Sequence, residues 1–181
     1  MLSLQQRKEL LALARTSISS HFEQIRVVLP EDEAFIPKKG VFVSLHKGEE
    51  LRGCIGYIKG YKSLAASVVE MAQAAAFSDP RFPSLIKEEL PRLTIEISVL
   101  DELLPMQAGE LPEIGKDGLY ISHPHGSGLL LPQVAVEWHW NAETFMKEVC
   151  RKAGLSSVAY MDPLSKIYKF AAEVFSEADT F

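Results

Sequence analysis

The sequence predicts an α+β protein with an antiparallel sheet and flanking helices, and two patterns support this fold class. Apolar strand-like segments arrive as hairpins: residues 41–46 and 51–58 flank a turn at 47–50, and a second hairpin spans 118–131. Capped helical segments stand between these strands. Because hairpins pair neighbouring strands antiparallel, we expect this arrangement rather than a doubly wound parallel sheet.

The helices are predicted from their caps and from apolar spacing. Ser3 with Gln6 has the capping-box pattern, Ser63 and Asn141 are N-cap residues, and Pro91 ends a short segment. The expected helices cover residues 3–22, 63–77, 84–90 and 141–153.

Two further strands follow from alternation, and one segment is ambiguous. Residues 93–100 alternate apolar and polar side chains as a half-buried strand does, and residues 168–174 repeat that pattern near the C-terminus. Residues 134–140 also alternate, but a flanking proline and short length equally suit a single helical turn.

Composition narrows the class of protein. The chain of 181 residues is 47% hydrophobic and 24% charged, which is typical of a folded globular protein. The net charge is −5 with scattered basic residues, so nucleic-acid binding is not expected. No apolar run has membrane-spanning length, and Met1–Arg15 lacks the apolar core of a signal peptide. Two cysteines make no disulfide framework, so we expect a cytoplasmic protein without membrane association.

The strand-like run Leu51–Ile58 contains the strongest candidate site. Side chains alternate along a strand, so Arg52, Cys54 and Gly56 are predicted to share one face. Glycine inside a strand marks a bulge or a close approach, and both Gly53 and Gly56 flank the cysteine. We therefore expect a cation beside a thiol, with Gly56 leaving that face bare.

Each of these residues has an alternative role. Cys54 is a candidate nucleophile because a nearby cation favours its thiolate, but it could equally be a small buried hydrophobe. Arg52 could receive an anion or pair with Glu96 or another strand carboxylate. The histidines considered as a base for Cys54 are His46, His123, His125 and His139.

Other residues are weaker candidates. The proline-bounded loop Asp79–Pro83 offers Arg81 as a ligand contact, although Asp79 and Arg81 could simply tie down helix ends. His123 and His125 could be metal ligands or a solvated turn pair, and because no third ligand is evident we predict no metal. Cys150 lies on an apolar helix stripe, while Trp138 and Trp140 suit either a planar ligand or a packing role.

Four blocks in this order resemble the AMMECR-type domain family, namely residues 51–56, 79–83, 89–93 and 131–135. The resemblance covers nearly the whole chain. It implies a single domain over 1–181, with a larger and a smaller lobe in one compact unit, and the Cys54 segment beside a cleft. It also favours a helical turn at 134–138. Trp138-His139-Trp140 departs from the family pattern, in which a single tryptophan preceded by glycine is expected.

The resemblance also bears on function, although the family's reaction is not established. Prokaryotic members are similar to one component of a set that includes a Memo-like protein and a radical-SAM protein, which implies these two as partners in a modification pathway. Combined with the motif, this predicts a cleft at Arg52 and Cys54 that binds a small anionic or peptide ligand. The rival hypothesis is a non-catalytic adaptor that uses the same cleft to bind a protein segment.

The predicted site residues follow from the hypothesis of a ligand-binding cleft at Arg52 and Cys54. Cys54 and His123 are the candidate catalytic residues, and the sequence identifies no cofactor. The expected ligand contacts are Arg52, Gly53, Gly56 and Arg81.

Overall fold

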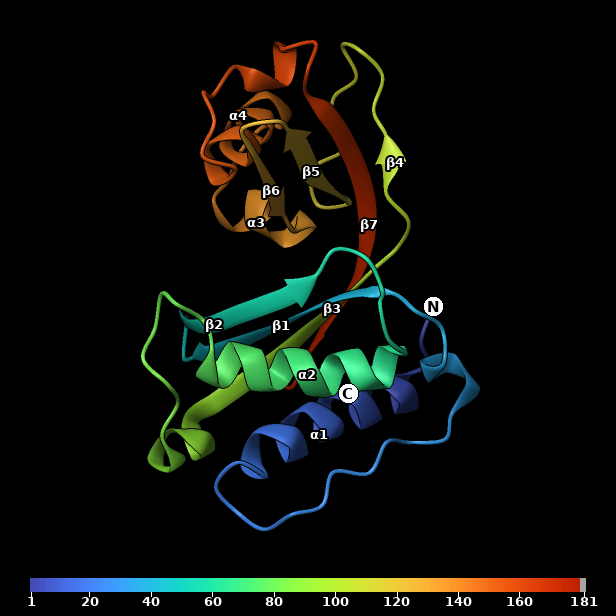
Figure 1. Cartoon of the computed structure of the whole chain (residues 1–181), viewed down its shortest axis with the longest axis vertical. Coiled ribbons are helices and arrows are strands. Elements are labelled where there is room, and N and C mark those ends of the chain that lie inside the picture. The colour runs from blue at the N-terminus through green and yellow to red at the C-terminus, as the bar shows by residue number, and fades with distance from the viewer. Residues whose placement is uncertain (180–181) are drawn as a thin grey trace. The chain divides into compact units, whose positions relative to one another are not determined.

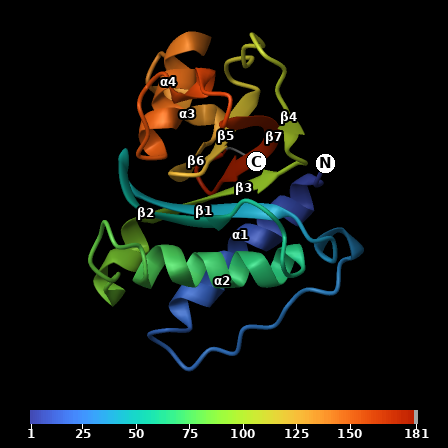
Figure 2. The ribbon, with the colours of Figure 1, turned by 45° about the horizontal axis from the view of Figure 1, so that its top comes forward.

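The structure, a computed structural model, describes residues 1–179 and contains two compact units (Figures 1 and 2). The first unit comprises Met1–Val99 and the C-terminal residues from Glu173, and the second comprises Leu100–Ala172. Helices and antiparallel strands occur in both units, which confirms the predicted α+β class.

In the first unit, two helices pack on one face of the strands (Figure 1). Its buried residues include Val43 and Leu45 from the first strand, Ile95 and Ile97 from the third, and Val68 from the second helix. The elements are α1 (Leu4–Ser19), η1 (Glu33–Phe35), β1 (Gly40–Lys47), β2 (Glu50–Tyr57), α2 (Leu64–Phe77), η2 (Lys87–Arg92) and β3 (Leu93–Leu100).

The helix caps form as the sequence predicts. The Ser3 hydroxyl accepts a hydrogen bond from the Gln6 backbone N–H at 3.3 Å, and the Gln6 side chain accepts one from the Ser3 N–H at 2.9 Å. Ser63 caps α2 through the Ala66 N–H. These bonds satisfy amide groups that the first helical turn leaves without partners.

The hairpin of β1 and β2 contains a bulge. Lys47 pairs with Glu50 and His46 with Leu51, but the next pair is Leu45 with Gly53. Arg52 is therefore an extra residue on β2, and the register beyond it shifts by one position. Ser44 consequently lies opposite Cys54. A bulge interrupts the alternation of side chains along its strand.

In the second unit, two helices pack on a hairpin. Phe145, Val149 and Cys150 of the longer helix are fully buried with Leu119 and Ile121 of the hairpin. The elements are β4 (Leu104–Pro105), β5 (Asp117–His123), β6 (Gly126–Leu130), α3 (Pro132–Glu137), α4 (Ala142–Lys152), η3 (Ala159–Met161) and β7 (Lys166–Ser176).

Hydrogen bonds link the strands in the order β2-β1-β3-β7-β5-β6, and β4 also pairs with β7. Strand β7 contributes its first residues to the second unit and its last residues to the first. Strand β2 stands at the end of this order, so one of its two edges has no strand partner within residues 1–179. None of the helices in that range combines the length and apolar character needed to cross a membrane.

Most predicted elements form, with shifted ends. Helix α1 ends at Ser19 rather than near Phe22, and β7 is longer than the predicted 168–174. The predicted helix over 84–90 is wrong: a 3-10 helix runs over Lys87–Arg92 and contains Pro91. Residues 84–85 are instead fastened to α2, because the Ser84 hydroxyl donates to the Phe77 carbonyl and the Leu85 N–H to that of Ala76.

The ambiguous segment at 134–140 is helical, as the family resemblance implies. Helix α3 ends in a Schellman motif, in which the Trp140 N–H donates to the Ala135 carbonyl and the His139 N–H to that of Val136. His139 has φ 53°, a left-handed conformation that glycine adopts without strain. The departure from the family pattern thus falls on the residue whose backbone favours glycine.

Replacing His139 with glycine is expected to stabilise the protein. A non-glycine residue in the left-handed region costs about 1–2 kcal/mol, part of which is offset by the greater freedom of glycine in the unfolded chain. The free energy of unfolding should rise by about 0.5–1 kcal/mol, measured by urea denaturation. His125→Gly, at an exposed turn position without positive φ, is the control and should not stabilise. A less stable H139G protein would contradict this account.

Candidate functional site

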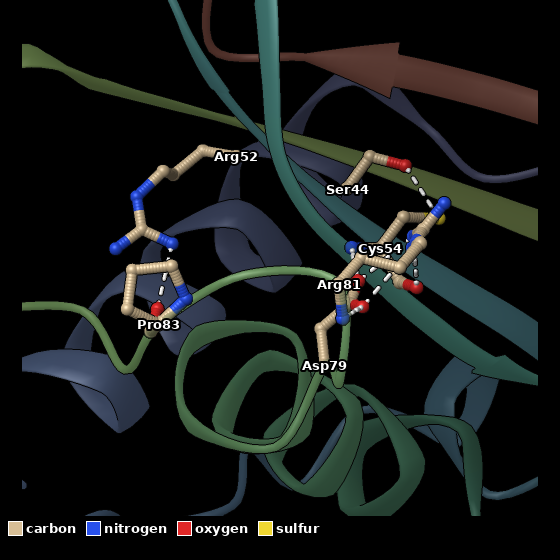
Figure 3. Close-up of polar contacts among 6 residues, drawn as sticks. All are labelled: Ser44, Arg52, Cys54, Asp79, Arg81 and Pro83. Carbon is tan, nitrogen blue, oxygen red and sulfur yellow. Dashed lines mark hydrogen bonds and ion pairs between the residues drawn. The ribbon is translucent and has the colours of Figure 1, made fainter.

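The thiol of Cys54 lies in the middle of β2, half-buried, with a hydroxyl beside it (Figure 3). Ser44, directly opposite on β1, donates a hydrogen bond to the sulfur at an Oγ–Sγ distance of 3.2 Å. The shared face follows from the register, since paired residues on adjacent strands project to the same side.

Asp79 and Arg81 bind the backbone of Cys54 from the loop that follows α2. The Asp79 carboxylate accepts a hydrogen bond from the Cys54 N–H at 2.9 Å, and the Arg81 guanidinium donates to the Cys54 carbonyl at 3.3 Å. Arg81 also donates to both carboxylate oxygens of Asp79, at 3.0 and 2.8 Å. We call these two residues the Asp79–Arg81 pair. It supplies the hydrogen bonds that a neighbouring strand would otherwise make at this edge of β2.

The charges of the Asp79–Arg81 pair are strongly coupled. The hydrogen bonds from Arg81 lower the pKa of the Asp79 carboxyl to about 2, assisted by the backbone N–H groups of Cys54 and Arg81. The Asp79 side chain is only 2% exposed, whereas that of Arg81 is 45% exposed. The Nη1 atom of Arg81 has no hydrogen bond within the described part of the chain. Arg81 therefore presents a cation to solvent beside Cys54 (Figure 3).

The Asp79 carboxylate is expected to contribute to stability in a pH-dependent way. Because its pKa is lower in the folded chain than the ordinary 3.8, its contribution is complete above about pH 4 and is lost as the pH falls through about 2. Asp79→Asn should lower the free energy of unfolding by about 2 kcal/mol at pH 7. The difference between wild type and D79N, followed by urea denaturation, should shrink toward pH 2. A difference independent of pH would contradict the ionised role.

The side chain of Arg52 does not lie beside that of Cys54. Its guanidinium donates to both carboxylate oxygens of Glu89, at 2.9 and 3.0 Å, and to the Pro83 carbonyl at 2.9 Å. Figure 3 shows it directed toward Pro83, away from Cys54. The predicted common face is wrong because the bulge at Arg52 interrupts the strand alternation. Hydrogen bonds from Arg52 lower the pKa of Glu89, so both partners of this ion pair are charged.

The two glycines of the motif are enclosed by other groups. A Cβ atom on Gly53 would lie 2.2 Å from the Ala75 carbonyl oxygen, so α2 packs directly on the β2 backbone there. A Cβ on Gly56 would lie 2.3 Å from the Phe42 ring. The ring of Phe42 therefore covers Gly56, and the bare surface expected at this position is absent.

The remaining candidates lie in other parts of the fold. His123 belongs to the second unit, where its Nδ1 accepts a hydrogen bond from the His125 N–H at 3.1 Å and its Nε2 lies 3.5 Å from Asp162. Burial raises the pKa of the Cys150 thiol, as expected for a core residue. Within residues 1–179, no three histidine, cysteine or acidic side chains gather as a metal site would require. A shallow apolar hollow of the first unit lies elsewhere, between α1 and residues 28–30.

Sequence reasoning missed two residues of the site. Ser44 was not singled out because the turn at 47–50, taken without the bulge, places it opposite Gly53 instead of Cys54. Glu89 was missed as the partner of Arg52, since nothing in their spacing indicates that η2 approaches β2. The alternative in which Arg52 pairs with a carboxylate is correct, but that carboxylate is Glu89 of η2 and not one on a strand.

The fold and site define a class of α+β proteins in which an antiparallel edge strand carries a half-buried thiol, held at its backbone by an Asp–Arg pair. Residues 11–175 match the AMMECR1 family, and the chain belongs to this family. A protein of Methanothermobacter thermautotrophicus is 40% identical over 185 residues, covering 97% of this chain and 96% of that protein. One from Thermococcus kodakarensis is 40% identical over 181 residues, covering 93% and 88%.

A solved structure shares the fold. The crystal structure of an uncharacterised protein from Pyrococcus horikoshii matches with a TM-score of 0.87 at 36% identity, covering 94% of this chain and 90% of that chain. The family resemblance identified from the four sequence blocks is therefore confirmed.

Proposed function

We propose that this AMMECR1-family protein binds a small anionic or peptide ligand at Cys54 and Arg81, with the Cys54 thiol as the reacting group. The observation that carries this proposal is the half-exposed Arg81 guanidinium, which bonds to the Cys54 backbone and keeps one nitrogen without a partner among residues 1–179. Guanidinium groups recognise carboxylates and phosphates through such N–H donors.

Arg81, rather than Arg52, is the anion contact in this proposal. Arg52 is only 13% exposed and its donors are occupied by Glu89 and by backbone carbonyls, so binding an anion there would break the ion pair. Arg52 and Gly53 instead act by holding β2 on α2 and the loop after it. Gly56 contributes only backbone, since Phe42 covers it.

The surroundings of Cys54 favour a reactive thiol. Thiolates are the nucleophilic form of cysteine, and nearby cations and hydrogen-bond donors increase their population. The positive charge of Arg81 and the hydroxyl donor of Ser44 both act in this direction. In the pathway we propose, a Memo-like protein and a radical-SAM protein act on the same substrate in the cytoplasm.

Selective alkylation tests the thiol role. The folded protein is treated with iodoacetamide, and modification is quantified for each cysteine-containing peptide by mass spectrometry. Cys54 should react in the folded state, and Cys150, buried in the second unit, only after denaturation. Cys150 thus serves as an internal control. Reaction of Cys54 only in denaturant would overturn the proposal.

The anion role of Arg81 has its own test. Iodoacetate carries a carboxylate that iodoacetamide lacks, so Arg81 should increase the iodoacetate rate relative to the iodoacetamide rate. Arg81→Gln should lower this ratio severalfold, while Lys62→Gln, an exposed cation of the same unit, should leave it unchanged. An unaltered ratio in R81Q would exclude Arg81 as the anion contact.

A non-catalytic adaptor is the second candidate, favoured by the exposed side chains at the C-terminal end of α3 and its cap residue. Trp138 is 67% exposed and Val136 is 50% exposed, and large exposed aromatic side chains are frequent anchors of protein interfaces. An adaptor should keep a Memo-like partner after Cys54→Ser and lose it after Trp138→Ala in a pull-down with purified proteins. If Cys54 is instead the reacting group, Cys54→Ser should abolish turnover by this protein together with its Memo-like and radical-SAM partners, while the fold remains intact.

A further inference from the structure

We propose that His46 is the residue that accepts the thiol proton of Cys54, an inference that rests on the proposed function of the Cys54 site. His46 is a positioning residue here, because it acts on a ligand only through the sulfur. Three observations support this role: its place in the register, its buried nitrogen, and the groups around the sulfur.

The strand register places His46 on the same face as Cys54. Residues alternate along β1, so His46 projects to the side of Ser44, and Ser44 pairs directly with Cys54. The bulge lies on β2 and leaves the alternation of β1 intact. His46 and Cys54 are therefore diagonal neighbours, with Cα atoms roughly 7–8 Å apart. At this spacing an imidazole reaches a thiol through one shared water.

The imidazole of His46 has an unused polar atom. Its Nε2 is buried and makes no hydrogen bond to the described residues. Buried polar atoms in proteins nearly always have partners, and this nitrogen is free of any bond to the described residues that would compete for a proton. His21, by contrast, stacks on Phe77 with ring centroids 4.0 Å apart. The Nε2 of His123 is also buried without a hydrogen bond to the described residues, but it lies 3.5 Å from Asp162 in the second unit.

Transfer of the thiol proton from Cys54 to His46 conserves atoms and charge and needs no other reactant. The Sγ–H bond of Cys54 breaks, its electron pair stays on the sulfur, and the proton moves to Nε2 of His46. The products are a thiolate and an imidazolium, so the net charge is unchanged. The Ser44 hydroxyl then donates to a charged sulfur, and Arg81, which donates to the Cys54 carbonyl, adds a positive charge nearby.

The other charged groups around His46 are held in ion pairs or lie in the adjoining strand and turn. Glu89 binds both Arg52 and Lys47, which flank His46 on β2 and β1. Asp79 neutralises much of the charge of Arg81. Glu96 on β3 and the turn residues Glu49 and Glu50 are the acidic groups of the neighbouring elements.

The dependence of Cys54 alkylation on pH tests the proposal. In wild type, the iodoacetamide rate at Cys54 should increase with an inflection below the ordinary thiol value of about 8.5. His46→Gln should move that inflection upward and slow the reaction at pH 7 about tenfold. His123→Gln, the same substitution in the second unit, is the matched control and should change nothing. An identical profile in H46Q and wild type would overturn the role of His46.

A second measurement does not require a reagent to reach the sulfur. Thiolate absorbance near 240 nm, taken as wild type minus C54S, reports ionisation of Cys54 directly, and the corresponding difference is measured in the H46Q background. We expect the H46Q transition at higher pH, and coincident transitions would refute the proposal. If Cys54 ionises below the ordinary thiol pH range with and without His46, the proposed thiol site is supported and the role of His46 is refuted. If alkylation of Cys54 requires denaturant, the proposed function is refuted, and the absorbance measurement alone tests the role of His46.

Discussion

Replacing Gly53 with alanine is expected to destabilise the protein by about 3 kcal/mol or more. The new Cβ would lie 2.2 Å from the carbonyl oxygen of Ala75, and the clash is with backbone that cannot rotate away. Relief requires α2 to move off β2, which would open the core formed by Val68, Ala72 and the inner residues of β1. Urea denaturation monitored by circular dichroism measures the loss.

Gly109→Ala is the matched control for this change. Gly109 has φ 81°, and a Cβ atom added there would have no neighbouring atom within 4 Å, so alanine meets only a conformational cost of about 1 kcal/mol. The contrast separates the close approach at Gly53 from the general effect of adding a methyl group. Equal losses in G53A and G109A would show that α2 does not press on β2 as described.

Replacing Arg52 with alanine is expected to cost about 3 kcal/mol of unfolding free energy. The substitution removes a two-point ion pair with Glu89 in which both side chains are only 13% exposed, and it leaves the Glu89 charge without its main partner. It also removes the donor to the Pro83 carbonyl, which fastens the loop after α2 to the strand.

Lys62→Ala provides the comparison for Arg52. Lys62 pairs with Glu70 at 2.7 Å, but its side chain is 56% exposed, and exposed pairs contribute less than about 1 kcal/mol. If R52A were as stable as K62A, the Arg52–Glu89 contact would add nothing beyond an ordinary surface pair. The two variants should also differ in salt response, because 1 M salt screens the exposed Lys62–Glu70 pair far more than the mostly buried Arg52–Glu89 pair.

The fold was largely predictable because its elements carry strong local signals. The caps at Ser3, Ser63 and Asn141 and the alternation in 93–100 each have a direct physical cause, and each element forms. Prediction failed at residues 84–90, where contacts with α2 override local preference. The two-residue strand β4 depends on pairing with β7, and no local pattern indicates such a contact.

Around Cys54, the backbone irregularities were predictable from the sequence and the side-chain contacts were not. The glycines correctly indicated a bulge or a close approach, and both occur, at Arg52 and at Gly53. The bulge then redirected Arg52 and shifted Ser44 into register with Cys54, which the turn alone does not reveal. Arg81 was only one of several ligand candidates, since its contact with Cys54 joins a loop to a strand 27 residues earlier.

The Asp79–Arg81 pair, which binds the backbone of Cys54, also affects how copies of this protein behave at high concentration. An exposed strand border is a template on which another molecule can build intermolecular β-structure. Here a carboxylate and a guanidinium occupy the backbone groups that such a template would offer. The Asp79–Arg81 pair thus protects this strand edge against fibril-like assembly, and weakening the pair would reduce colloidal stability.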